Sequence, residues 1–131
     1  MISQPVEVIL LRQLATYLAV PVWVMGADGD LLFYNEAAEP LIGRAFEDQR
    51  GPISADELAE LFATTSEDGE PIPSEELPIV VALKQRLPSH RRLRFQSFDG
   101  ASHLIEVSAF PITGQGDRHL GAMALFWEVH P

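Results

Sequence analysis

The sequence predicts an α+β fold, a five-stranded antiparallel sheet with helices on one face and an amphipathic helix preceding it. Apolar residues recur at helical spacing over residues 5–20 and again in the middle of the chain. Five runs of β-forming residues stand in two groups, two before the middle helices and three after them. Asp-Gly pairs at 28–29 and 99–100 favour tight hairpins within these groups. Strands joined by hairpins pair antiparallel, so one antiparallel sheet accounts for this order.

Length and composition limit the classes of function. The 131 residues suit one domain, and 47% of them are hydrophobic, which is enough to bury a core. The net charge of −10 argues against binding to nucleic acid or anionic lipid, because both need a basic surface. No apolar run reaches the roughly 18 residues of a membrane span, and no basic segment precedes residues 5–20 as it would in a signal peptide. We therefore expect a cytoplasmic protein without nucleic-acid or membrane contacts.

The first helix is expected over residues 5–20, with Pro5 at its first position and Pro21 at its end. Its apolar residues form one stripe at three- and four-residue spacing. We divide the chain into this flanking helix, residues 1–20, and a domain over residues 21–131. The helix is the expected dimerisation element, and its candidate interface residues are Val6, Ile9, Leu10, Leu14, Tyr17 and Leu18.

A hairpin follows, with strands at 22–25 and 31–34, and it stops at Asn35. Asn is among the best N-cap residues, because its side-chain oxygen accepts hydrogen bonds from the free N–H groups of the first helical turn. The sequence therefore predicts a strand that turns directly into a helix, with Asn35 as a structural cap and Gly43 at the helix end.

Two more helices are expected in the middle of the chain. Ser54, with Glu57 at the capping-box position, begins the first of them. An acidic loop rich in Pro and Gly follows. Ser74 is then expected to cap a helix over residues 75–87, with Pro78 in its first turn, where the missing N–H does little harm.

Three strands close the chain, at residues 92–96, 103–112 and 120–129. The last two carry apolar residues on both faces, whereas an antiparallel sheet normally leaves one face to water. We therefore expect the middle helices on one face of the sheet. We expect residues 5–20 on the other face, from the same chain or from a second subunit.

Four segments of the sequence, in this order, resemble a PAS domain of the bacterial sensor type. Residues 21–43 resemble its opening hairpin and first helix, where Asp-Gly turns the hairpin and Asn-x-Ala begins the helix. Residues 67–83, with Pro-x-Pro and Glu-Leu-Pro, resemble the connector and long helix of sensor-kinase members. Residues 98–112 and 121–130 resemble the second hairpin and the last strand. Each segment alone is a weak signal, but four in register over residues 20–130 are specific.

This resemblance implies a sensory or signalling module that is not an enzyme. Members of the family hold a small molecule, haem, flavin or nothing between the sheet and the helices. They usually dimerise through the N-terminal helix or the outer face of the sheet. They pass a signal to a kinase, cyclase or DNA-binding output, as in two-component systems, so the chain is expected to be a sensory piece of a longer protein or a free-standing module. Where the family often ends in Asp-Ile-Thr, this chain has Glu128-Val129-His130, whose glutamate keeps the charge but not the length.

The ligand pocket that the resemblance implies should be lined by apolar residues of the helices and of the inner face of the sheet. The same residues would fill a packed core if no ligand binds, so a ligand-free dimerisation scaffold is the alternative function. The candidate pocket residues are Leu41, Leu61, Ile79, Leu83, Phe95, Ile105, Val107, Met123 and Leu125.

The sequence also limits the cofactors, whose identity it leaves unknown. It has no cysteine, which excludes the cysteinyl-flavin adduct and Cys-based metal sites, while non-covalent flavin stays open. The helix expected over residues 75–87 has no His, and we expect His90, beside Arg91 and Arg92, in solvent rather than on a haem iron. No His, Asp or Glu residues stand at a metal-site spacing.

A small cavity-bearing isomerase is a further alternative, because such α+β enzymes have a similar length. It needs a buried acid or His with a Tyr partner. Tyr34 and Glu106 are the residues to consider. We expect Glu106 to be exposed, because it lies on the opposite strand face from Ile105 and Val107. We therefore assign no catalytic residues.

One basic patch stands out in this acidic sequence. We interpret it as a solvated face that balances the acidic loop at residues 67–76, and the alternative is a site for an anion or an acidic partner. The patch consists of Arg86, His90, Arg91, Arg92 and Arg94.

Overall fold

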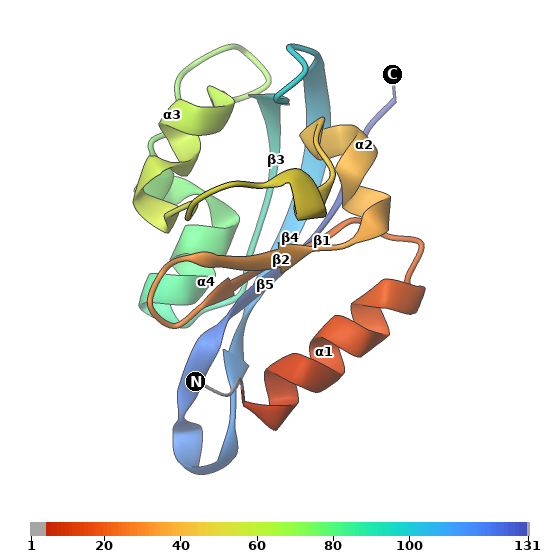
Figure 1. Ribbon diagram of the computed structural model, residues 1–131. Coiled ribbons are helices and arrows are strands. Elements are labelled where there is room, and N and C mark those ends of the chain that lie inside the picture. The colour runs from red at the N-terminus through yellow and green to blue at the C-terminus, as the bar shows by residue number, and fades with distance from the viewer. Residues whose placement is uncertain (1–4, 131) are drawn as a thin grey trace.

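In the computed structural model, which describes residues 5–130, five strands form one antiparallel sheet in the order β2-β1-β5-β4-β3 (Figure 1). The strands are β1 (Val22–Gly26), β2 (Leu31–Tyr34), β3 (Ser89–Gln96), β4 (Ser102–Thr113) and β5 (His119–Glu128). The α-helices of the described residues are α1 (Val6–Tyr17), α2 (Glu39–Ile42), α3 (Leu58–Phe62) and α4 (Pro78–Gln85). The predicted fold class is confirmed.

Short 3-10 helices complete the connections. Two of them lead directly into α-helices, so the middle of the chain is a series of tight turns rather than long helices. They are η1 (Glu36–Ala38), η2 (Phe46–Asp48), η3 (Ala55–Glu57), η4 (Ser74–Glu76) and η5 (Gln115–Asp117). None of the described helices is long and apolar enough to cross a membrane.

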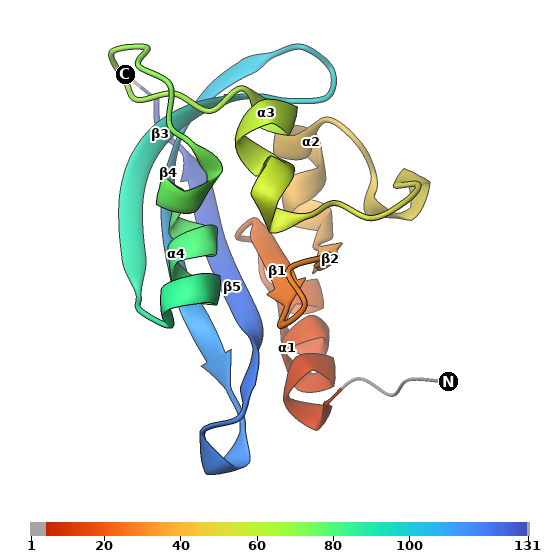
Figure 2. The ribbon, with the colours of Figure 1, turned by 90° about the vertical axis from the view of Figure 1, so that its left-hand side faces the viewer.

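Two layers cover the two faces of the sheet. Helix α4 packs on β3, β4 and β5, and α3 lies beside it on the same side (Figure 2). Helix α1 lies well apart from α3 and α4 (Figure 1). Its side chains share an apolar cluster with Val22, Val24 and Met123, which belong to the outer face of the sheet. The larger apolar cluster lies on the other, inner face. A helix of the same chain therefore provides the cover that the two-sided apolar strands require.

Successive residues of β1 alternate between the two layers. Val22 and Val24 face outward, as does Met123 of the adjacent strand β5. Trp23 and Met25, at the positions between and after the valines, face inward. The alternation follows from the geometry of a strand, in which neighbouring side chains point to opposite faces.

Asn35 is the predicted cap, and its side chain does more than cap. Its Oδ1 accepts hydrogen bonds from the N–H groups of Ala38 (3.2 Å) and Val22 (2.9 Å). Its Nδ2 donates to the carbonyl oxygens of Ala15 (3.0 Å) and Val20 (2.9 Å). The buried Asn35 amide therefore joins α1, the start of β1 and η1 at one point.

Helix α1 ends earlier than expected, at Tyr17 rather than before Pro21. Leu18 is already extended, and the chain from there to β1 passes the Asn35 amide, which holds the carbonyl of Val20. At the end of the helix, backbone carbonyls accept hydrogen bonds from the Asn35 amide rather than from the helix itself. Asn35 is distant in the sequence, so the helical periodicity did not predict where the helix ends.

The predicted interface stripe of α1 faces away from the sheet. Instead a second stripe packs on the outer face, formed by Val8, Leu11, Ala15 and Leu18. Of the predicted stripe, only Leu18 packs there, and the side chains left exposed are Val6, Ile9, Leu10, Leu14 and Tyr17. Both stripes are apolar, so the sequence alone did not decide which of them meets the sheet.

The middle helices are shorter than expected, and Ser74 does not cap the helix that follows it. The capping box of Ser54 and Glu57 is confirmed at the start of η3. The Ser74 hydroxyl instead accepts a hydrogen bond from the N–H of Ala59 in α3, at 2.9 Å. Helix α4 begins only at Pro78, because Leu77 before it is extended. Ser74 thus satisfies a free N–H of a different helix.

Strand β3 is longer than predicted. It begins at Ser89, and the polar run Ser89–Arg91 pairs with Val107–Ala109 of β4. Because β3 pairs with the long strand β4, it extends beyond the segment in which polar and apolar residues alternate in the sequence. The β4–β5 hairpin, which turns through η5, projects beyond the helices in both ribbon views (Figures 1 and 2).

Candidate functional site

A cavity of about 90 Å³ lies on the inner side of the sheet, between β-strands and the residues of α3 and α4. The surface that faces the cavity is entirely apolar. The lining residues are Trp23, Ile42, Leu58, Phe62, Thr64, Leu77, Pro78, Ile79, Leu93, Phe95, Ile105, Val107, Ala124 and Phe126.

Some of the candidate pocket residues line this cavity and others do not. Ile79, Phe95, Ile105 and Val107 line it. Leu41 and Leu83 belong to the same inner core without lining the cavity. That these residues bind a ligand stays a prediction.

Three candidate pocket residues lie elsewhere. Leu61 is exposed on α3. Met123 and Leu125 pack in the outer cluster, beneath α1. The phase of β5 was wrong by one residue, because this strand is apolar on both faces and a shift by one exchanges them.

Several residues of the cavity lining were not predicted from the sequence, and those on β5 were missed because of that error in phase. Ala124 and Phe126 are the inward residues of β5. Trp23 lies opposite Ala124 in the register of β1 and β5. Phe62 stands at the end of α3. The alternation of β1 places Trp23 on the opposite face from the neighbouring valines, and packing against the helices decides that this face borders the cavity.

Aromatic rings form one wall of the site. The rings of Trp23 and Tyr34 stack at 5.4 Å between centroids. Phe62 meets Trp23 edge-on at 5.8 Å and Phe95 edge-on at 5.7 Å. Such pairs restrict one another to a single arrangement, so the Trp23 ring is held in place from two sides.

Tyr34 does not offer its hydroxyl to the cavity. The Tyr34 hydroxyl donates to the carbonyl oxygen of Arg44 at 2.8 Å. Burial raises the pKa of this phenol, because the charged form would lose its hydration. The Tyr34 hydroxyl is therefore a neutral structural donor.

The residues of the basic patch predicted from the sequence do not all lie on one face of the structure. Arg91 pairs with Val107, an inward residue of β4, so it lies on the other strand face from its neighbours His90 and Arg92. Arg86 stands at the end of α4, in the left-handed conformation. The patch is therefore smaller than the sequence suggests, and its three members on one strand face are His90, Arg92 and Arg94.

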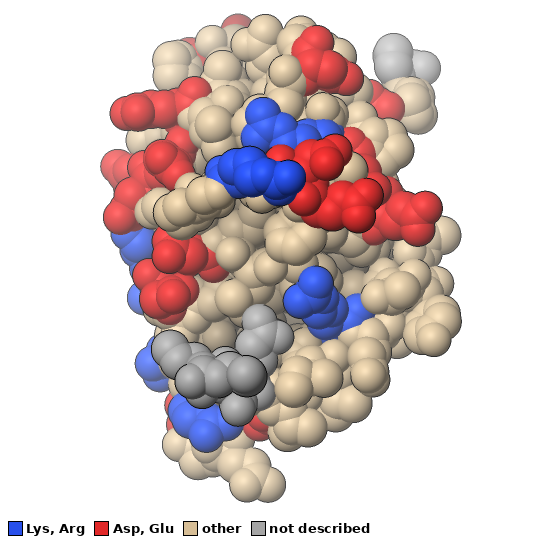
Figure 3. Space-filling model, viewed as in Figure 1, with Lys and Arg blue, Asp and Glu red and all other residues tan. Residues whose placement is uncertain are grey.

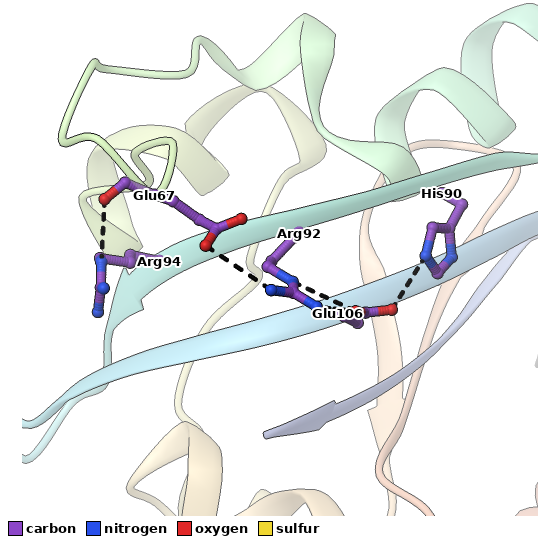
Figure 4. Close-up of polar contacts among 5 residues, drawn as sticks. All are labelled: Glu67, His90, Arg92, Arg94 and Glu106. Atoms are coloured by element: carbon purple, nitrogen blue, oxygen red, sulfur yellow. Dashed lines mark hydrogen bonds and ion pairs between the residues drawn. The ribbon is translucent and has the colours of Figure 1, made fainter. Parts of the chain in front are cut away.

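Carboxylates meet this reduced patch on the outer face of the sheet. Arg92 donates to Glu106 (Nη2 to Oε1, 2.6 Å) and lies 3.7 Å from the Glu67 carboxylate. His90 Nε2 lies 3.1 Å from the other Glu106 oxygen, and Figure 4 shows these groups in a row. Hydrogen bonds from Arg92 hold the pKa of the Glu106 carboxyl below its usual value. The contact with Glu67 of the acidic loop agrees with a solvated, charge-balanced face.

The last strand ends in a second polar pair. Glu128 stands where the family often has Asp, and its Oε2 lies 2.6 Å from Nδ1 of His103 on β4. The His103 ring stacks on Phe95 at 5.5 Å. The Glu128 side chain therefore connects β5 to β4 within the sheet. Among residues 5–130, no three His, Asp or Glu side chains come together as a metal site.

Comparison with known proteins supports the fold. No protein-family model and no curated protein matches the sequence. Among solved structures, the PAS domain from Bordetella pertussis BvgS is 15% identical, with a TM-score of 0.68, over 97% of this chain and 89% of that one. The PAS domain of nitrogen regulation protein NR(II) from Vibrio parahaemolyticus is 18% identical, with a TM-score of 0.61, over 92% and 98%. A PAS domain from Colwellia psychrerythraea is 16% identical, with a TM-score of 0.59, over 93% and 96%.

This chain has the PAS fold. The likeness spans nearly the whole of each chain. The cavity lies within the PAS fold, on the side of the sheet that α3 and α4 cover.

Proposed function

We propose that the protein is a sensory or interaction module with the PAS fold, non-catalytic and cytoplasmic, that acts as a homodimer and passes a signal to an output protein or domain. The observation that carries this proposal is the exposed apolar stripe of α1. Leu10 is 57% exposed and Tyr17 87% exposed, although the other stripe of the same helix is packed on the sheet.

An apolar stripe of this kind indicates a protein partner. Single exposed apolar residues are common, but a continuous row along one helix marks an interaction surface. The surface over α1 is mostly uncharged, while acidic side chains gather over the upper half of the same view (Figure 3). The molecule carries a net charge of −10, and two copies meeting through this uncharged surface would avoid much of their mutual repulsion.

The dimer is tested by adding charge to the stripe. We expect the unmodified protein to have twice the 14.5 kDa mass of the chain in light scattering. Leu10→Asp with Leu14→Asp should reduce it to the monomer mass, because burying a carboxylate in an apolar interface is costly. The control is Gln85→Asp, which adds the same charge at an exposed polar position at the end of α4, on the other side of the sheet. A dimer that survives the double change would refute this interface.

The cavity supports a sensory role, with a ligand that is small. Pockets for drug-sized ligands measure roughly 300–1,000 Å³, far more than the cavity here. Haem and flavin are larger than this cavity admits without rearrangement, and His90 lies on the outer face rather than beside it. The ligand-free scaffold is the second candidate function, because a packed core also leaves small cavities that hold no ligand.

The isomerase alternative finds less support. Glu106 lies on the outer face, where Arg92 pairs with it, and the pKa of its carboxyl is lowered rather than raised. An acid catalyst in a cleft needs the opposite shift. Tyr34, its prospective partner, is engaged by the backbone of Arg44.

A further inference from the structure

Strand β3 is an edge of the sheet, and only part of its free side has a backbone partner. The strand pairs with β4 on one side. On the other side, Arg94 exchanges two backbone hydrogen bonds with Thr65, at 3.0 and 2.8 Å. Every second residue of an antiparallel strand points its N–H and C=O groups to the same side. The N–H and C=O groups of His90 and Arg92 therefore point away from β4, like those of Arg94.

The free side of β3 is open to an incoming segment. Beyond Thr65 the loop leaves the edge, because it turns back on itself with a hydrogen bond from the Gly69 N–H to the Ser66 carbonyl oxygen at 3.0 Å. Among the described residues, none forms a backbone hydrogen bond with the outward groups of His90 and Arg92. In Figure 2, β3 runs along the border of the molecule with no described strand or helix beyond it. A sheet edge with unpaired N–H and C=O groups is a template for another strand.

The side chains along this edge are basic. Strand β3 carries three of the nine Lys and Arg residues of the chain, so its charge is opposite to that of the molecule as a whole. Arg91 and Arg94 form no ion pair within the part of the chain that the structure describes. Arg92 binds Glu106 and also lies 3.7 Å from Glu67, which reaches it from the loop beside the edge (Figure 4). A carboxylate from a neighbouring segment is therefore already accommodated next to the edge.

We infer that the free part of β3, from His90 to Arg92, is a docking site for an extended acidic segment of a partner protein, which adds to the sheet as a further strand. Backbone hydrogen bonds to His90 and Arg92 hold the segment. Successive residues of an extended segment point to opposite faces, so its carboxylates can reach both Arg91 and Arg94. This inference rests on the proposed interaction role and names the chemistry of a partner, but it does not use the dimer surface on α1.

A second copy of β3 does not fit this edge. Antiparallel pairing of two β3 strands would bring the arginines of one copy against those of the other. Like charges on paired strands are destabilising, whereas opposite charges stabilise the pair. Charged side chains on edge strands commonly prevent such self-association. The arginines therefore exclude further copies of this strand and favour an acidic one.

Two peptides that differ only in charge test the inference. The acidic probe is Glu-Val-Glu-Glu-Val-Glu with both termini blocked, and its control has Gln in place of each Glu. A ¹⁵N–¹H spectrum of the full chain follows the backbone amides of β3. We expect the acidic probe to shift the amide protons of His90 and Arg92 downfield, saturably, because these donors gain an acceptor. The amides of Arg91 and Leu93 face β4 and should shift less.

Variants separate the backbone hydrogen bonds from the charge. His90→Pro removes an N–H that points away from β4, which an edge strand tolerates, and its control His90→Gln keeps that N–H. We expect the Kd of the acidic probe to be about two- to tenfold higher in His90→Pro than in His90→Gln. Arg91→Gln should raise this Kd about two- to fivefold. Arg50→Gln removes the same charge at an exposed position outside β3 and should leave the Kd unchanged.

Four results would overturn the inference. Equal binding of both peptides would show that the edge does not select acidic segments. Binding that leaves the amide protons of His90 and Arg92 in place would show a contact with side chains and no added strand. If neither peptide binds, the edge is not a docking site. If dilution of the chain alone moves these amide protons, the edge belongs to a second copy. The proposed dimer through α1 is judged independently, by light scattering of its own variants.

Discussion

At the scale of single residues, buried side chains with several hydrogen bonds set the geometry of this domain. Asn35 is the main example, because its one amide serves segments that are 20 residues apart in the sequence. The amide donates two hydrogen bonds and accepts two, which uses its full hydrogen-bonding capacity. Its role therefore goes beyond helix capping and includes the attachment of α1.

Asn35 variants should separate these two roles. Asn35→Ala removes all four hydrogen bonds and should lower the free energy of unfolding by about 3 kcal/mol or more, because several buried groups lose their partner. Asn35→Asp keeps the oxygen for Val22 and Ala38 but places a carboxylate against the carbonyls of Ala15 and Val20. In Asn35→Asp, hydrogen exchange should accelerate in α1 before it does in β1. Equal protection of α1 in this variant and in the unmodified protein would contradict this role.

Glu106 gives a pH-dependent prediction. Its folded pKa is lowered by Arg92, so its contribution to stability is present above the unfolded pKa of about 4.3 and is lost as the pH falls through the lower folded value. Glu106→Gln should therefore be less stable than the unmodified protein at pH 7, and the difference should disappear in acid. Urea unfolding at several pH values measures it, with Glu60→Gln on the exposed surface of α3 as control. A difference that is constant with pH would exclude the ion pair as its cause.

At the scale of elements, strand β5 determines how the two layers meet. It lies at the centre of the sheet, between β1 and β4, and contributes to both apolar clusters. Near its start, Gly121 pairs with Gly26 of β1 and has a φ of +143°. A Cβ at this position would lie 2.0 Å from the carbonyl oxygen of Met25. The close approach of the two strands therefore requires glycine here.

Gly121→Ala should be strongly destabilising, by about 3 kcal/mol or more, because backbone rather than a mobile side chain must move. The control is Gly29→Ala in the β1–β2 turn, which also has a positive φ but has no atom within 4 Å of the added Cβ. We expect the control to cost about 1 kcal/mol, from backbone conformation alone. Thermal and urea unfolding of both variants would check this, and equal losses would show that contact with Met25 is not the cause.

At the scale of the whole molecule, α1 connects the two parts of the proposed function. One of its stripes covers the sheet of its own chain, and the other is free for a second copy. The proposed ligand cavity lies on the opposite face of the same sheet. The central strand β5 contributes alternate residues to both sides, so one strand lies between the cavity and the residues beneath α1. This arrangement suits a module that reports ligand binding to a partner.

The sequence alone determined the features that depend on neighbouring residues. The hairpin turns, the Asn35 cap, the Ser54 capping box and the five strands all follow from local chemistry, and the structure has each of them. A turn or a cap involves residues a few positions apart, so its signal is contained in a short stretch.

Only the tertiary structure decided the questions in which two faces are chemically alike. Strand β5 and helix α1 are apolar on two sides, and which side meets which layer depends on the partner rather than on the element itself. The acceptor role of Ser74 toward Ala59, and the Asn35 contacts with α1, join residues too far apart for a local pattern. The cavity is decided in the same way, because its volume is what remains after side chains from several strands and helices have packed together.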